Sequence, residues 1–234
     1  MQVVGVDNCP RGWIAVELNT DTTDLTTRFF GRFTDLLVAY ADVPAIAVDV
    51  PIGLMDGTPR RCDIEARKRL GWPGMANIFP APARSMIAVT DFREAKEQTR
   101  ARYGHAVTRR SFSMFRQVAE LDAAMTPELQ NRVYEIHPDM SFWAMNGRNA
   151  LQFGKKTQAG LEDRLALLAK HFVGFNVPSS RREAKALAPL AGVDDLLDAI
   201  AAAWTARRIG DGIAEYLPAT PEIDERGLRM EIAI

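Results

Sequence analysis

Two short apolar runs, each followed by an aspartate, most constrain how this chain can fold. VVGV precedes Asp7 and AIAV precedes Asp49. Such runs are typical of buried strands, and a carboxylate at the end of one is costly unless it emerges into a solvated crevice. Open α/β sheets bind ligands in that crevice. We therefore expect an α/β fold in which Asp7 and Asp49 lie side by side at the edge of the sheet.

The remaining patterns predict a mixed five-stranded sheet flanked by helices. Residues 2–7 form the first strand, GWIAVEL its hairpin partner and TDLTTRFFGRF a third strand, before a helix over 34–41 with Thr34 as N-cap. The AIAVD strand should neighbour the first strand, and the strand in NRVYEIHP (131–138) should neighbour AIAVD. Further helices are predicted over 158–174, 181–190 and 193–216, and GLRMEIAI is a candidate edge strand.

Residues 56–128 differ in composition from the rest of the chain. They are strongly charged, are punctuated by Pro and Gly, and contain helical patterns but no convincing strand. Within them, 93–116 carries an excess of arginine and lysine over glutamate. We interpret 56–128 as a helical, partly basic insertion within one domain that spans 1–234, a length that fits a single domain.

The overall charge and the cysteines limit the class of protein. Twenty-nine Lys and Arg face 30 Asp and Glu, a net charge of -1, so no global field attracts nucleic acid or an acidic membrane. Cys9 and Cys62 form no CxxC pair, which disfavours structural zinc and indicates a reducing compartment. With no signal-peptide pattern and no apolar run of about 20 residues, we expect a cytoplasmic protein without membrane contact.

A second pair of acids opens the last long helix. Asp195 and Asp198 are three residues apart and share one helix face, and Asp194 is the candidate N-cap. The alanines that follow make the helix thin, so its backbone can approach the sheet closely. The positive end of the helix dipole favours carboxylates in the first turn, so the pair is equally compatible with a purely structural, capping role.

Together, Asp7, Asp49, Asp195 and Asp198 predict a divalent metal site. Adjacent carboxylates repel, and an oxygen-only ligand set without clustered His or Cys favours Mg²⁺ or Mn²⁺ over zinc. Two such ions about 3.5–4 Å apart suit in-line displacement at phosphorus. The reaction class indicated is phosphodiester hydrolysis.

Seven segments in register carry a resemblance to a known family. The chain resembles the predicted RNase H-like nucleases catalogued as domain of unknown function 429, which are distantly similar to the Holliday-junction resolvase RuvC and to YqgF. The resemblance implies an RNase H-like fold, in which Asp7 and Asp49 match the acids of the first and fourth strands, and Asp195 and Asp198 match an Asp-x-x-Asp helix start. Glu135 matches an acid of the family that the resolvases lack. The segments are GVDNCPRGW (5–13), AVDVPIGL (47–54), RCDIEARKRLG (61–71), IFPAPAR (78–84), YEIHPDMSF (134–142), KKTQAGLEDRLALL (155–168) and DDLLDAIAAAW (194–204).

Other polar residues are candidates for the same site. Glu135 would complete the metal shell, and His137 would shuttle a proton or touch phosphate, although a histidine before proline is often structural. Lys155 and Lys156 precede a helix that starts near Thr157 and would bind phosphate there, unless they are simply solvated. Arg61 and Arg84 of the insertion are candidate contacts to a nucleic-acid backbone.

Three functions compete. The first is a Mg²⁺- or Mn²⁺-dependent nuclease that acts on DNA or RNA. A homodimer is the candidate assembly for such an enzyme. The second is a non-catalytic module that binds nucleic acid or another partner on the same fold. The third is a phosphotransferase of the actin and sugar-kinase type, which is disfavoured because DNCPRGW lacks the Gly- and Thr-rich phosphate loop. The sequence does not distinguish DNA from RNA.

Overall fold

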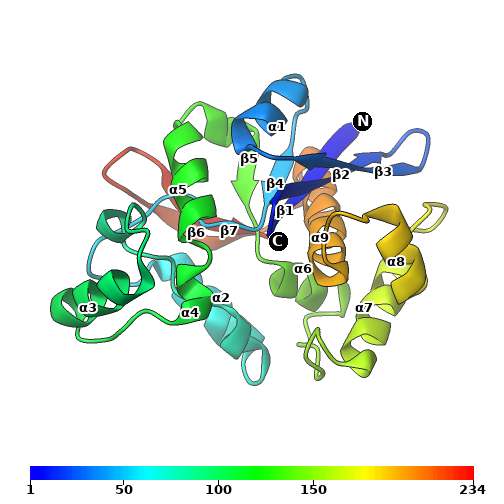
Figure 1. Cartoon of the computed structure of the whole chain (residues 1–234). Helices are drawn as coiled ribbons and strands as arrows, with labels where there is room; N and C mark the ends of the chain where they lie inside the picture. The colour runs from blue at the N-terminus through cyan, green and yellow to red at the C-terminus, as the bar shows by residue number, and fades with distance from the viewer.

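A five-stranded mixed sheet forms the centre of the computed structural model, which describes residues 1–234 (Figure 1). Its order is β3-β2-β1-β4-β5. β1, β2 and β3 pair antiparallel, whereas β4 and β5 run parallel to β1. The predicted α/β class and the three predicted strand pairings are confirmed. The bounds are β1 (Gln2–Cys9), β2 (Gly12–Asn19), β3 (Asp24–Phe30), β4 (Ile46–Val48) and β5 (Val133–Glu135).

Helices cover both faces of this sheet. The core on one face includes residues of α1 and α5, and the core on the other face includes residues of α6, α7, α8 and α9. Figure 1 shows the second group together on the right of the molecule and α5 on the left. The bounds are α1 (Phe33–Ala39), α5 (Phe115–Ala124), α6 (Pro138–Met145), α7 (Gln158–His171), α8 (Arg181–Leu187) and α9 (Val193–Gly210).

The side chains of β1 alternate between these two cores. Val4 and Val6 pack in the core of α1 and α5, while Val3 and Cys9 pack in the core of α9. Successive side chains of a strand point to opposite faces. Asp7 is therefore on the α9 side of the sheet.

Helix α9 crosses β1 at very close range. A Cβ placed on Gly5 would lie 2.0 Å from the backbone nitrogen of Ala203 and 2.2 Å from the carbonyl oxygen of Ala199, so only glycine fits there. At the far end of the helix, Gly210 lies against Met1. The helix thus runs antiparallel to β1, with its first turns near the end of the strand that carries Asp7. The predicted close approach of the alanine-rich helix is confirmed.

The segment 56–128 contains helices and no strand, as predicted. It is joined to the core of the protein at two places, because α5 packs on the sheet and α2 packs on the C-terminal hairpin. Its helices are α2 (Arg61–Leu70), α3 (Phe92–Tyr103), α4 (Arg109–Phe112) and α5, with short 3-10 turns at Gly74–Asn77 and Arg84–Met86.

The C-terminal prediction was partly wrong. Helix α9 ends at Gly210 rather than at 216, and a strand that the sequence did not indicate follows it. This strand, β6 (Tyr216–Ile223), pairs antiparallel with β7 (Arg229–Ala233) as a separate two-stranded sheet. Pro218 and Pro221 argued against a strand here, because proline within sheets is confined to edge strands, strand starts and bulges. The predicted last strand is present as β7, but it touches the main sheet only through the bridge between Ile136 and Ala233.

Several predicted helix ends were also wrong. The helices predicted to end at 174 and 190 end at His171 and Leu187. Arg32 rather than Thr34 is the N-cap of α1, and Gly192 rather than Asp194 is the N-cap of α9. Local patterns locate a helix better than they locate its last turn, which frays or is cut short by packing.

Every helix of the protein is too short or too polar to span a lipid bilayer.

Candidate functional site

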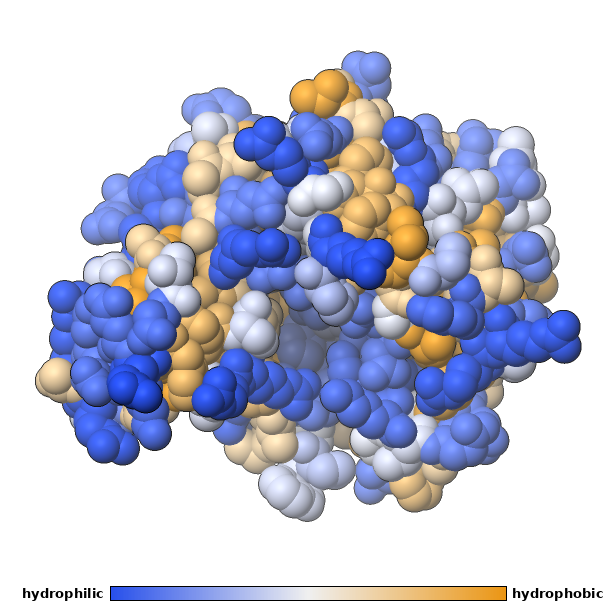
Figure 2. Space-filling model, viewed as in Figure 1, coloured by the Kyte–Doolittle hydropathy of each residue, from blue (hydrophilic) through white to orange (hydrophobic).

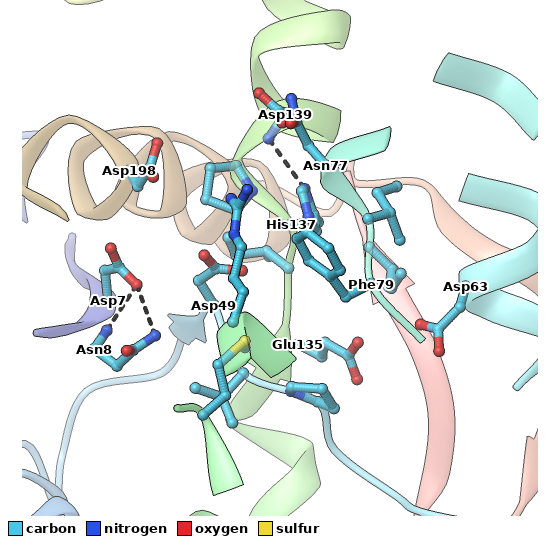
Figure 3. Close-up of a pocket in the computed structure, with 18 of the residues that line it drawn as sticks. Asp7, Asn8, Asp49, Asp63, Asn77, Phe79, Glu135, His137, Asp139 and Asp198 are labelled. Atoms are coloured by element: carbon cyan, nitrogen blue, oxygen red, sulfur yellow. Dashed lines mark hydrogen bonds between the residues drawn. The ribbon is translucent and has the colours of Figure 1, made fainter. Parts of the chain in front are cut away.

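Three aspartates from separate elements meet at the carboxyl ends of β1 and β4 (Figure 3). Asp7 lies near the end of β1, Asp49 directly follows β4, and Asp198 lies in the second turn of α9. One carboxylate oxygen from each lies within 4.8 Å of the others. The parallel pairing of β1 with β4 places the first two together, and the close crossing of α9 over Gly5 adds the third.

Two of these aspartates are buried and Asp49 is half-buried, and their negative charges are poorly balanced. Asp7 and Asp198 are only 4% and 2% exposed. Burial raises the pKa of Asp7 well above its ordinary value, and the negative charges of Asp49 and Asp198 raise it further. Burial also raises the pKa of Asp49, to about 7, and that of Asp198. Near neutral pH the cluster therefore favours any species that supplies positive charge.

Lys155 supplies one such charge. Its Nζ donates a hydrogen bond to Oδ2 of Asp198 over 2.5 Å. The ammonium group lowers the pKa values of Asp7 and Asp49, while the carboxylate of Asp198 raises the pKa of Lys155 itself. The neighbouring Lys156 is exposed and does not line the cavity. Of the two predicted lysines, the structure brings one to the carboxylates.

The second acid of α9 has a different partner. Oδ2 of Asp195 accepts a hydrogen bond from the backbone nitrogen of Gly192 over 3.0 Å, which caps the helix. Asp195 still lines the same cavity, and burial raises its pKa. It lies outside the group formed by Asp7, Asp49 and Asp198. The structural role that the sequence left open thus applies to Asp195 and not to Asp198.

Glu135 does not join the three aspartates. Its carboxylate accepts hydrogen bonds from Nη1 and Nη2 of Arg60 at 2.8 and 2.7 Å and from the backbone nitrogen of Ile52 at 2.7 Å. Arg60 also binds Asp63, at 2.6 and 3.2 Å, and all three charged side chains are buried. Glu135 is therefore neutralised inside the protein. The same pairing disfavours a metal at the second acidic group, which Asp63 and Glu135 form with Cys62.

His137 lines the cavity as the N-cap of α6. Its Nδ1 accepts a hydrogen bond from the backbone nitrogen of Asp139 over 3.2 Å. The proton of the neutral ring is then on Nε2. When the ring is protonated, its positive charge lowers the pKa of the Asp49 carboxyl group, against the larger effect of burial.

The two predicted arginines, Arg61 and Arg84, do not line the cavity that holds Asp7, Asp49 and Asp198. Arg84 binds the carboxylates of Asp122 and Asp224, and its ion pairs tie the insertion to the C-terminal hairpin. Arg61 is exposed and pairs with Glu65 one helical turn later. Neither lines the acidic cavity. Both were candidates because of charge alone, and nothing in the sequence indicates the distant partners of Arg84.

The insertion supplies a second wall of the cavity. The cavity has a volume of about 220 Å³, and only 6 of its 22 lining residues are hydrophobic. Arg110 lies over the ring of Phe79 at 4.5 Å, and Asn77 lies beside them in the lining. The basic excess over 93–116 was the one available signal for Arg110. Figure 2 shows a hollow near the centre of this face with mainly hydrophilic residues around it.

The fold and the site define an α/β protein with a buried carboxylate cluster in a polar cavity at the strand ends. A family model described as "Protein of unknown function (DUF429)" matches residues 5–223, and the chain belongs to this family. No curated protein and no solved structure gave a significant match to the chain.

Proposed function

We propose that the protein is a metal-dependent nuclease with an RNase H-like fold, which hydrolyses phosphodiester bonds of nucleic acid. The sheet order, the antiparallel first three strands and the long last helix across β1 support this fold. The acids of β1, of the end of β4 and of α9 occupy the three positions that the resemblance implies for catalytic residues.

The observation that carries the proposal is the convergence of Asp7, Asp49 and Asp198 within 4.8 Å. All three offer carboxylate oxygens, which are hard ligands that Mg²⁺ and Mn²⁺ prefer. Burial and mutual repulsion raise their pKa values, so the ionised cluster is stabilised by added positive charge beyond that of Lys155. The donor set therefore fits such an ion, and Asp195 lines the same cavity as a further carboxylate. A bound ion would lower the pKa of an attacking water and neutralise charge that develops on the phosphate.

The chain's own cations bind and orient the substrate. The ammonium group of Lys155, once a metal takes over Asp198, is free to pair with a phosphate oxygen. Nε2–H of His137 is a hydrogen-bond donor in the same cavity. Arg110 supplies a further positive charge from the opposite wall.

The two alternatives differ in what they require. A kinase-like site needs a Gly- and Thr-rich phosphate-binding loop after the first strand, but here the turn between β1 and β2 consists of Pro10 and Arg11. This composition disfavours that function. A non-catalytic module would bind nucleic acid without cleaving it. A cleavage assay with labelled nucleic acids separates it from a nuclease.

The test uses the purified protein, Mn²⁺ or Mg²⁺, and fluorescently labelled single-stranded, duplex and branched DNA and RNA. We expect cleavage that EDTA stops and that Asp7→Asn and Asp198→Asn abolish. Asp42→Asn, at an exposed position in the loop after α1, is the matched control and should cleave normally. Binding without cleavage by the wild-type protein in all these conditions would support the non-catalytic module instead.

A further inference from the structure

Two large aromatic side chains are exposed beside the carboxylate cavity. Trp72 is 81% exposed and Phe153 is 52% exposed, although most aromatic residues of the chain are at least partly buried. Both line one groove of about 210 Å³. Asn77 and Asp139 line this groove and also the carboxylate cavity, so the two are adjacent. Exposed apolar side chains that gather next to a site indicate a binding surface.

The two aromatics come from loops that pack against each other. Trp72 lies between α2 and the following 3-10 turn, and Phe153 lies between α6 and α7. The connections after α2 and after α6 are at the lower side of Figure 1. A Cβ on Gly74 would lie 3.5 Å from the Cβ of Ala150, which shows how close the loops are. We name this surface the aromatic groove.

The Phe153 side of the aromatic groove is held in place. A Cβ on Gly160 of α7 would lie only 2.2 Å from the carbonyl oxygen of Gly154, so the loop rests directly on the helix. Nη1 of Arg164 donates to the carbonyl oxygen of Phe153 over 3.4 Å. A platform fixed before binding loses less entropy when a ligand arrives.

Arg164 also leaves one donor without a partner. The residue is 2% exposed and lines the aromatic groove, and its Nη2 donates to Asp139 over 3.0 Å. Its Nε is buried and makes no hydrogen bond. A buried donor without an acceptor is costly.

Lysines lie close to both aromatics along the chain. Lys68 is exposed four residues before Trp72, and Lys155 and Lys156 follow Phe153 by two and three residues. This combination of flat apolar rings and nearby ammonium groups suits a polyanion that carries exposed aromatic rings. Single-stranded nucleic acid has both, whereas the bases of a duplex are already stacked on one another.

We propose that the aromatic groove binds unpaired nucleotides of a single strand, with one base stacked on Trp72 and one on Phe153. The stacked bases lead the adjoining phosphate past Asn77 and Asp139 to the carboxylates. This inference rests on the proposed nuclease function, for which it names the substrate class: nucleic acid with unpaired bases next to the bond that is cut.

Binding is tested without catalysis, in EDTA and low salt, with an oligothymidylate and with a duplex of the same length. Trp72 is the most exposed tryptophan, so stacking should quench the intrinsic fluorescence of the wild-type protein. Trp72→Ala should remove most of that quenching, and each of Trp72→Ala and Phe153→Ala should weaken binding roughly 5- to 100-fold. Trp72→Phe should restore most of the affinity. Val173→Ala, at a position 80% exposed, is the control and should bind normally.

The outcomes separate this inference from the proposed function. Normal oligothymidylate binding by both alanine variants, or tighter binding of the duplex than of the single strand, would overturn the inference even if metal-dependent cleavage occurs. Quenching without cleavage would support the aromatic groove and contradict the nuclease. If wild-type protein is a dimer and Trp72→Ala makes it a monomer without altering oligonucleotide binding, the surface is an interface between copies and the inference is wrong.

Discussion

The α-carbon of Gly5 in β1 lies so close to α9 that a Cβ on it would be 2.2 Å from the carbonyl oxygen of Ala199. This contact sets the distance between strand and helix, and therefore the distance between Asp7, two residues further along β1, and Asp198, which precedes Ala199. The geometry of the carboxylate cluster thus depends on a residue that carries no functional group.

Gly5→Ala should disturb both the fold and the cluster. The new methyl group meets backbone atoms, so α9 must move, and we expect a loss of about 3 kcal/mol or more in the free energy of unfolding. Gly31→Ala is the control, since a Cβ there has nothing within 4 Å. Urea denaturation of both variants measures the difference. Equal stability of Gly5→Ala and the wild-type protein would show that the close crossing is not what holds α9.

Replacement of Lys155 should affect metal-free and metal-bound protein in opposite directions. Lys155→Met removes the only ammonium group hydrogen-bonded to the cluster, so the metal-free protein should lose about 1–3 kcal/mol of stability. Mn²⁺ should bind more tightly, because it no longer competes with the ammonium for Asp198. Calorimetric titration with Mn²⁺ measures the second effect. Lys156→Met, one residue away and exposed, should change neither quantity.

Arg60 should prove structural rather than catalytic. Arg60→Met leaves Asp63 and Glu135 buried without a counter-charge, which we expect to cost about 3–5 kcal/mol. Arg61→Met removes only an exposed pair with Glu65 and should cost less than about 0.5 kcal/mol. Chemical denaturation compares the two variants directly. A small loss for Arg60→Met would mean that solvent or another cation reaches the two carboxylates.

Stabilisation by metal should grow with pH. The unfolded carboxyl of Asp49 titrates near 3.8, and burial raises its folded pKa to about 7. Because the folded pKa is the higher one, the contribution of Asp49 to the stability of the metal-free protein is complete below about pH 4 and is lost as the pH rises through about 7. Mn²⁺ requires the ionised carboxylates and relieves their repulsion.

Melting curves with and without Mn²⁺ at about pH 5.5 and about pH 8 test this coupling. We expect the larger increase in Tm at the higher pH, and Asp49→Asn should make the increase small at both. An equal increase at both pH values in the wild-type protein would contradict binding at Asp49.

Much of the fold was predictable, because local patterns reflect local physics. The apolar runs before Asp7 and Asp49 and the alanine-rich run of α9 each identify an element. Strand β6 was missed because its two prolines contradict the usual composition of a strand. It is stabilised by pairing with β7, which the residues of β6 alone do not indicate.

The candidate site was predictable only where the pairing of strands places its residues together. Asp7 and Asp49 are neighbours because two parallel strands are neighbours. Glu135 fits the same argument, yet its carboxylate binds Arg60, which lies 75 residues earlier in the chain. The exposure of Trp72 and Phe153 was equally hidden, since the usual expectation for such residues is burial.

The sequence by itself determined the five strands of the main sheet and most of the helices, and that acids stand at the ends of two buried strands. Periodicity and burial cost act within a few residues and can be recognised without coordinates. The tertiary structure alone decided which of those acids remain available, because a charged side chain pairs with whatever opposite charge the fold brings near it. Asp198 meets Lys155 at the cluster, whereas Glu135 is neutralised by Arg60.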